Sequence, residues 1–280
     1  MHEPGSVSST AMVRNIAVIR VGRAGPELDS AVVEEPLEIR LQGRPFAVVM
    51  RTPGDDRALA AGFLLAEGLI RDADDIGAIE HCRHPATPEV HNVVNVFLMG
   101  EAVTSLRTRL DMKRNITTTS SCGLCGRVTI DSLKRKLPRL AISWRIKRDL
   151  VAELPTRLRS RQRAFDSSGG LHAAGLVTPD GRCERSAEDV GRHNAVDKVV
   201  GAMLLDDEQL PLSSHALVVS GRTSFEIVQK AWIAGIGLVC AVSAPSTLAI
   251  DLAAEAGITL LGFARDGGFN VYSHPERIKL

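Results

Sequence analysis

Residues 216–268 read ALVVS-GRTS-FEIVQKAWIAG-IGLVCAV-SAPS-TLAIDLAAEAG-ITLLGFA-RDGG, in which short apolar runs alternate with segments of helical period. The runs predict strands at Ala216–Ser220, Gly237–Val242 and Ile258–Ala264, with helices at Phe225–Ala234 and Thr247–Ala256 between them. Such an alternation favours a parallel sheet. Thr223-Ser224-Phe225-Glu226 has the pattern of a capping box at the first helix, and Gly257 suits a left-handed end of the second.

The sequence ahead of this unit supplies one more helix and, further back, a smaller domain. Asn194–Leu205 places an apolar face that should pack on the sheet. Near the amino terminus, strands are expected at Ile16–Val21, Leu37–Leu41, Phe46–Arg51 and Asn92–Met99, with a turn at Gln42–Pro45 and a helix at Arg57–Ile70. The fold class is therefore α/β, α+β overall, with a small N-terminal mixed-sheet domain and a C-terminal α/β domain built on a parallel sheet.

Composition divides the chain into five predicted segments. They are a disordered tail (1–14), an N-terminal α+β domain (15–115), a mobile cysteine loop (116–127), a basic and partly helical connector (128–165) and a C-terminal domain (166–280). Between Leu133 and Arg163, eleven Lys or Arg residues stand against only Asp149 and Glu153. This region is either a solvated face or a docking surface for an acidic protein or a phosphate-bearing ligand.

The overall composition narrows the function without fixing it. The 280 residues are 44% hydrophobic, and the formal net charge of +1 gives no bias toward nucleic acid or a membrane. We expect a cytoplasmic protein, because the sequence shows neither a signal-peptide pattern nor an apolar run of about 18 residues. The five cysteines are an odd number, and Cys82, Cys183 and Cys240 are scattered, which disfavours a disulfide framework. Cys240 falls inside an apolar strand and is interpreted as a buried hydrophobic residue.

Polar segments follow each of the three predicted parallel strands. They are Ser220–Ser224, Ser243–Ser246 and Arg265–Gly268, and Glu188–Asn194 opens the preceding helix in the same style. Ligands of open parallel sheets bind beyond the carboxyl ends of the strands, where helix amino termini attract anions. Arg222 and Arg265 add groups suited to bidentate phosphate contacts. Any one of these loops alone is ordinary loop chemistry, but together they predict a pocket for a phosphorylated, heterocyclic ligand. Serine hydrolysis is disfavoured, because Ser220–Ser224 lacks the Gly-x-Ser-x-Gly pattern.

Residues 117–127, TTTSSCGLCGR, place Cys122 and Cys125 two residues apart in a polar surround. A zinc site would need further ligands, for which only the segment 81–84, with Cys82 and two histidines, offers itself. A thioredoxin-like dithiol would need the pair to open a helix in a βαβ unit, whereas here it follows a run of hydroxyl residues. The third interpretation is a persulfide carrier, in which one thiolate accepts sulfur and its neighbour releases it by thiol exchange.

Four motifs in this order resemble the formate dehydrogenase accessory sulfurtransferase family, FdhD. They are SCGLCGR at 121–127, EDVGRHNAVDK at 188–198, SGRTSFE at 220–226 and FARDGGFNVY at 263–272. The resemblance covers most of the chain from about Leu37 onward. It implies a cytoplasmic homodimer whose C-terminal domain is a three-layer, cytidine-deaminase-like α/β domain that lacks the deaminase zinc, with no metal bound directly by the protein. It also implies that sulfur is taken from a cysteine desulfurase and delivered to the bis-molybdopterin guanine dinucleotide form of the molybdenum cofactor, for formate dehydrogenase.

The resemblance further implies roles for particular residues. Cys122 matches the persulfide-bearing cysteine and Cys125 the second cysteine of the family loop. Phe263, Ala264, Arg265, Asp266, Gly267 and Gly268 match the stretch that binds the guanine nucleotide portion of the cofactor, which a free guanine nucleotide would mimic. The loop argument and the family likeness together add Gly221, Arg222, Thr223, Ser224, Arg192 and His193 to the cofactor site. Two alternatives stay open: a non-catalytic chaperone that holds the cofactor, and a zinc enzyme on a deaminase-like fold.

Overall fold

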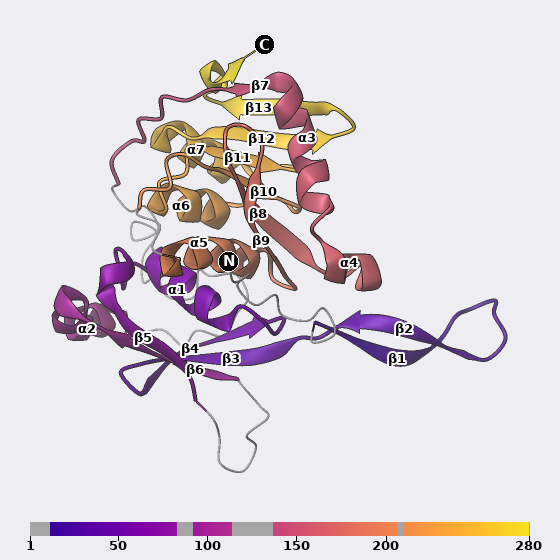
Figure 1. The fold of residues 1–280 in the computed structure, drawn as a ribbon, viewed down its shortest axis with the longest axis horizontal. Helices are drawn as coiled ribbons and strands as arrows, with labels where there is room; N and C mark the ends of the chain where they lie inside the picture. The colour runs from indigo at the N-terminus through magenta and orange to yellow at the C-terminus, as the bar shows by residue number, and fades with distance from the viewer. Residues whose placement is uncertain (1–11, 83–91, 114–136, 207–209, 280) are drawn as a thin grey trace, which may run out of the picture.

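The computed structural model describes residues 12–82, 92–113, 137–206 and 210–279 (Figure 1). Its first part contains β1 (Val13–Ile19), β2 (Pro26–Val32), β3 (Glu35–Leu41), β4 (Arg44–Arg51), α1 (Asp56–Glu67), β5 (Ile76–His81), β6 (Val93–Leu98) and α2 (Gly100–Lys113). The second part contains β7 (Ile146–Lys147), α3 (Arg148–Arg159), α4 (Arg163–Ser168), β8 (His172–Val177), β9 (Cys183–Asp189), α5 (Arg192–Leu205), β10 (Ala216–Val219), α6 (Phe225–Ile233), β11 (Leu238–Ala241), α7 (Thr247–Ala256), β12 (Thr259–Arg265), β13 (Gly268–Ser273) and β14 (Ile278–Lys279).

The N-terminal sheet has the strand order β4-β3-β6-β5, and α1 packs on it. The predicted hairpin is confirmed, because β3 and β4 are antiparallel and joined by Gln42 and Gly43. Both turn residues have positive φ, 51° and 78°, the geometry that matches the twist of a two-residue hairpin. The predicted helix is α1, and it ends where Gly68 adopts the left-handed conformation.

A separate two-stranded ribbon, β1 with β2, projects from this domain (Figure 1). The sequence prediction ended the disordered tail at residue 14 and began the first strand at Ile16. The structure instead pairs Val13 with Val32, so the strand includes Val13 and Arg14. The partner strand β2 was missed because its sequence, PELDSAV, lacks the apolar alternation of a half-buried strand.

The C-terminal domain confirms the predicted strand-helix-strand unit. β10, β11 and β12 are parallel neighbours, with α6 and α7 as the crossover helices. The sheet is nevertheless mixed, with the order β13-β12-β11-β10-β8-β9, because β8, β9 and β13 are antiparallel to their neighbours. The prediction of a parallel sheet is therefore confirmed for the three strands that it concerned, and the structure adds antiparallel strands at both edges of the sheet.

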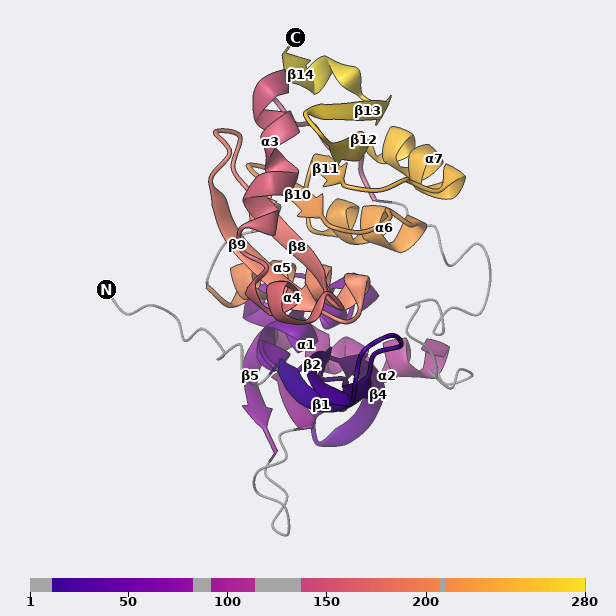
Figure 2. The ribbon, with the colours of Figure 1, turned by 90° about the vertical axis from the view of Figure 1, so that its right-hand side faces the viewer.

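Three layers make up this domain, as the family resemblance implied (Figure 2). α5, α6 and α7 cover one face of the sheet, and α3 covers the other. Successive residues of the central strands alternate between the two cores, so Leu217 and Val219 face α5 and α6 while Val218 and Cys240 face α3. Cys240 is fully buried, which confirms its interpretation as a core residue, and burial raises the pKa of its thiol to about 12. The basic segment predicted as partly helical contains α3 and the start of α4.

The two domains meet where α1 of the first crosses α5 of the second. A Cβ atom added at Gly201 would lie 1.9 Å from the carbonyl oxygen of Ala58, and one added at Gly62 would lie 2.0 Å from that of Asp197. The helices therefore approach backbone to backbone, which only glycine permits. α5 also packs on the sheet as predicted, so it is buried on both sides. Among the described residues, the helices are too short or too polar to cross a lipid bilayer.

Candidate anion-binding site

Four elements come together at one edge of the C-terminal sheet. Because β8 is antiparallel to both β9 and β10, its first residue, His172, lies beside the end of β9 and the end of β10. Two hydrogen bonds fix this arrangement: the backbone N–H of Ala173 donates to Ser220 Oγ at 2.8 Å, and the Ser220 N–H donates to the carbonyl of Ala173 at 3.0 Å. The loop after β10 is thereby held against the start of β8.

The polar loops predicted after the parallel strands are in contact with one another. Thr223 N–H donates to the carbonyl of Ala244 at 3.2 Å, and Ser246 N–H donates to the carbonyl of Thr223 at 3.0 Å. The loop after β11 then contacts the end of β12, where Phe263 N–H donates to the carbonyl of Ser243 at 3.2 Å. The three strand ends therefore form one continuous polar edge.

The third predicted loop differs from the other two in form. Arg265, Asp266, Gly267 and Gly268 are the exposed tip of the β12–β13 hairpin and do not lead into a helix. The chain reverses after β12 into the antiparallel strand β13 instead of crossing over through a helix. Phe263 has a φ of 52° and is 39% exposed, whereas Ala264 is buried in the α3 core. The described hydrogen bonds tie only Phe263 of this stretch to the other loops.

The predicted capping box at α6 is also wrong. Ser224 is the N-cap residue, but its side chain makes no capping hydrogen bond. Its hydroxyl lies 3.1 Å from His193 Nε2, and Glu226 Oε2 lies 3.8 Å from the same nitrogen. His193 reaches these groups because it sits in the first turn of α5, only 6% exposed. A tertiary partner has therefore displaced the local cap.

At this edge, the N-cap residues of α5 and α6 make no side-chain capping hydrogen bond. α5 begins after Gly191, which has no side chain to offer, and α6 begins after Ser224. Uncapped N–H groups and the helix dipole favour an anion at each terminus. Thr223, 1% exposed, adds a hydroxyl that has no hydrogen-bond partner within the described ranges. This edge of the sheet thus presents unused donors.

Positive side chains gather at the same place. A Cβ atom added at Gly221 would lie 3.2 Å from Nδ1 of His172 and 3.8 Å from Cδ of Arg192. Gly221, His172 and Arg192 therefore border the same space. Arg192 Nε is buried and has no hydrogen-bond partner in the part of the chain that the structure describes. Burial, followed by the charges of Arg192 and Arg222, lowers the pKa of His172, against a smaller opposing effect of Asp189. We call the group His172, Arg192, Gly221 and Arg222 the anion site.

A buried ion pair holds the Arg192 loop in place. Lys198 Nζ lies 2.8 Å from Asp189 Oδ2, and the two side chains are 1% and 0% exposed. Asp189 Oδ1 also accepts hydrogen bonds from Gly191 N–H at 2.8 Å and from Asn194 Nδ2 at 2.9 Å. The carboxylate therefore fixes the start of α5 directly. Because its charge is matched by Lys198, it does not neutralise the two arginines of the anion site.

Thr52, which directly follows β4 in the N-terminal domain, forms hydrogen bonds with the same loop and with Lys198. Its N–H donates to Asp189 Oδ2 at 3.2 Å, its carbonyl accepts from Lys198 Nζ at 2.9 Å, and its hydroxyl accepts from Val190 N–H at 3.2 Å. Sequence reasoning missed Thr52, Asp189, Lys198 and His172. The motif at 188–198 contains two of them, but nothing local links it to a threonine in another domain.

Replacing Thr52 with valine should lower the free energy of unfolding by about 1–2 kcal/mol, because the partly buried Val190 N–H loses its acceptor. Urea unfolding measures the change. The matched control is Thr156→Val on the exposed face of α3, which should change stability by less than about 0.5 kcal/mol. Equal stabilities for the two variants would contradict the role assigned to the Thr52 hydroxyl.

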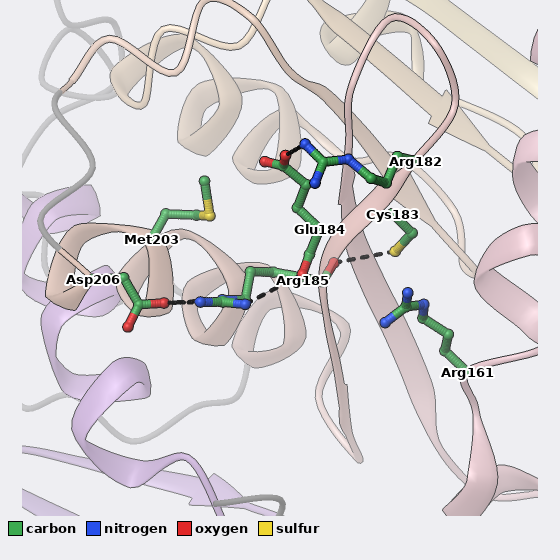
Figure 3. A pocket seen from close by; sticks show the side chains of 7 residues that line it. All are labelled: Arg161, Arg182, Cys183, Glu184, Arg185, Met203 and Asp206. Carbon is green, nitrogen blue, oxygen red and sulfur yellow. Dashed lines mark hydrogen bonds and ion pairs between the residues drawn. The ribbon is translucent and has the colours of Figure 1, made fainter. Parts of the chain in front are cut away.

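A pocket of about 400 Å³ opens elsewhere, beside the start of β9 (Figure 3). Cys183 pairs with Val177, which pairs with Ala216 at the start of β10, so this pocket lies at the opposite end of the strands from the anion site. It is lined by Arg161, Arg182, Cys183, Glu184, Arg185, Met203 and Asp206, none of which was predicted as a site residue. Arg182 pairs with Glu184, and Arg185 pairs with Asp206. The two carboxylates that line the pocket are therefore already neutralised by arginines. Burial raises the pKa of the Cys183 thiol, although Arg161 opposes this.

The predicted sulfur-carrying residues Cys122 and Cys125 lie outside the described residues. The prediction for them therefore stays untested by the structure. Within the described ranges, His, Cys, Asp and Glu side chains form no group of three that could hold a metal ion.

Comparisons with known proteins add independent findings. The model of the FdhD/NarQ family matches residues 32–279. Two proteins named "Sulfur carrier protein FdhD", from Streptomyces avermitilis and Streptomyces coelicolor, are each 50% identical over 271 residues, which cover 95% of this chain and 95% of theirs. A third of that name, from Anaeromyxobacter dehalogenans, is 45% identical over 281 residues, covering 99% of this chain and 95% of its own. A crystal structure assigned to a formate dehydrogenase accessory protein of Desulfotalea psychrophila has a TM-score of 0.72 and 26% identity, covering 95% of this chain and 98% of the other.

Proposed function

Because the chain belongs to the FdhD/NarQ family, we propose that it is a sulfur carrier that serves formate dehydrogenase. It accepts sulfur as a persulfide on Cys122 from a cysteine desulfurase and passes it to bis-molybdopterin guanine dinucleotide. The names of the relatives support the carriage of sulfur, and the similar solved structure supports the link to formate dehydrogenase. The protein would do this in the cytoplasm, as a homodimer.

The observation that carries the cofactor part of this proposal is the anion site. Two uncapped helix amino termini and two arginines without carboxylate partners among the described residues meet beside Gly221. The nucleotide portion of the cofactor carries phosphates, which suit such a site. Phe263 stands on the same polar edge with an exposed ring, which suits the face of a guanine base. The contacts therefore support binding of the nucleotide end of the cofactor at this edge.

The sulfur chemistry follows from the two thiols. The Cys122 thiolate attacks the outer sulfur of the donor persulfide, so the donor S–S bond breaks, a new one forms on Cys122, and the donor cysteine leaves as a thiolate. Arg127, five residues on, favours the thiolate form of Cys122. For release, the Cys125 thiolate attacks Cys122 Sγ, which forms a disulfide and sets free hydrosulfide. Cys125 acts in this scheme as the resolving cysteine.

Mass spectrometry after incubation with a cysteine desulfurase and cysteine tests the scheme. The wild-type chain should gain one sulfur atom at Cys122 and activate formate dehydrogenase, and Cys122→Ala should do neither. Cys82→Ala is the matched control, because it removes a cysteine far along the chain and should keep both properties. A Cys122→Ala variant that gains sulfur at Cys125 and still activates the enzyme would overturn the assignment. Full activation by a chain lacking both cysteines would favour a cofactor-holding chaperone instead.

A further inference from the structure

His172 stands at the centre of the anion site, although neither the loop pattern nor the family motifs pointed to it. It is the first residue of β8, and its imidazole borders the same space as Gly221 and Arg192. The missing side chain at Gly221 leaves the ring edge uncovered on that side, since an added Cβ would lie 3.2 Å from Nδ1 and 3.4 Å from Cε1. The ring is half-buried and open to a ligand that lies against the loop.

The charges facing His172 come from three elements. Arg192 belongs to α5, Arg222 to the loop after β10, and Asp189 to the end of β9. The Asp189 carboxylate is already matched by Lys198 and by its hydrogen bonds to Thr52, Gly191 and Asn194. Arg192 and Arg222 have no ion-pair partner among the residues that the structure describes. The charges of the described residues therefore favour the neutral form of the imidazole on balance.

Resting on the function proposed above, we propose that His172 is a third ligand for the phosphate of the bound nucleotide and takes up a proton when that phosphate binds. A phosphate placed between Arg192 and Arg222 offsets their charges and offers an acceptor oxygen to the imidazole. Both effects stabilise the imidazolium form. In the free protein, burial and the two nearby arginines favour the neutral form of the ring.

The direction of the pH dependence follows from this arrangement. Burial and the two arginines hold the pKa of His172 below its ordinary value in the free protein, and bound phosphate raises it. Binding is accordingly tightest at pH values below the free-state pKa, where His172 is protonated in both states. The affinity falls as the pH rises through the interval between the two pKa values, and it is constant again above the bound-state pKa.

Titration calorimetry of the full chain with guanosine diphosphate tests the inference, run in two buffers with different heats of ionisation. The wild-type protein should take up protons on binding, and His172→Gln should take up fewer, since the titration of the nucleotide itself is common to both. His172→Gln should bind about tenfold more weakly near pH 6, with a smaller difference near pH 8. His215, buried at the far end of β10 beside Glu184, serves as an internal control in NMR titrations and should not respond to the nucleotide.

The outcomes separate this inference from the proposal on which it rests. Nucleotide binding with equal proton uptake in wild type and His172→Gln would overturn the role of His172 alone. An unchanged His172 NMR titration in the presence of the nucleotide would do the same. If neither guanosine diphosphate nor inorganic pyrophosphate bound the wild-type protein, the anion site itself, and with it the cofactor part of the proposed function, would be wrong.

Discussion

Replacing Lys198 with methionine should lower the free energy of unfolding by about 3–5 kcal/mol, the cost expected for a buried charge that loses its partner. Asp189 is fully buried, and its carboxylate would keep only neutral donors from Thr52, Gly191 and Asn194. The ammonium group also donates to the Thr52 carbonyl at 2.9 Å, which the variant leaves without that donor. Chemical denaturation followed by circular dichroism measures the loss.

A double-mutant cycle with Asp189→Asn separates the ion pair from its surroundings. Asp189→Asn alone should also be strongly destabilised, because Lys198 then carries the unmatched charge. The double variant buries no net charge, so it should lose less stability than the sum of the two single variants. Lys147→Met, at an exposed position, is the matched control and should be nearly neutral. Additive losses in the cycle would show that the pair is not coupled.

Gly201→Ala should destabilise the protein by about 3 kcal/mol or more, the upper end for overpacking. The added Cβ would lie 1.9 Å from the Ala58 carbonyl oxygen, which is backbone and cannot rotate away, so α1 and α5 must separate. In an isolated helix the same change would be favourable by about 1 kcal/mol, because alanine is the better helix former. A loss therefore reports on the helix crossing and not on helix formation. Thermal and urea unfolding both measure it.

The control for this variant is Gly268→Ala. Position 268 is exposed, and a Cβ there would meet only the Arg265 carbonyl, at 3.8 Å. Its stability should stay within about 0.5 kcal/mol of wild type. Gly62→Ala, on the other side of the crossing, should behave like Gly201→Ala, because its Cβ would lie 2.0 Å from the Asp197 carbonyl. A stable Gly201→Ala protein would mean that the two helices have room to move apart.

Much of the fold could be predicted because the signals are local. Gly257 ends α7 and Gln42-Gly43 turns β3 into β4, each through a backbone conformation that its own residues favour. The strand-helix alternation from Ala216 onward likewise gave β10, β11 and β12 in the right order. The capping box at α6 failed for the opposite reason. Its residues matched the local pattern, but His193, from another helix, engages the Ser224 hydroxyl instead.

The candidate site was predictable in part. Arg192, Arg222 and Gly221 were found because ligands gather where parallel strands end, which depends only on strand order. His172 escaped notice because β8 is an antiparallel addition to the sheet, and no pattern at 172 shows which strand ends it will face. Asp189 lies in the predicted segment 188–194, but nothing local shows that its carboxylate pairs with Lys198. Thr52 escaped notice because it belongs to the other domain.

By itself, the sequence determined the alternating strands and helices of the parallel core of the C-terminal sheet, the family likeness and the cysteine pair on which the proposed sulfur chemistry depends. Periodicity, turn residues and motifs depend only on residues that are close along the chain, so they can be recognised without the tertiary structure. Only the tertiary structure decided that the positive charges of Arg192 and Arg222 meet at His172, while Lys198 neutralises Asp189. Distances across the sheet and between domains decide which charges are paired and which remain available to a ligand. No local sequence pattern specifies those distances.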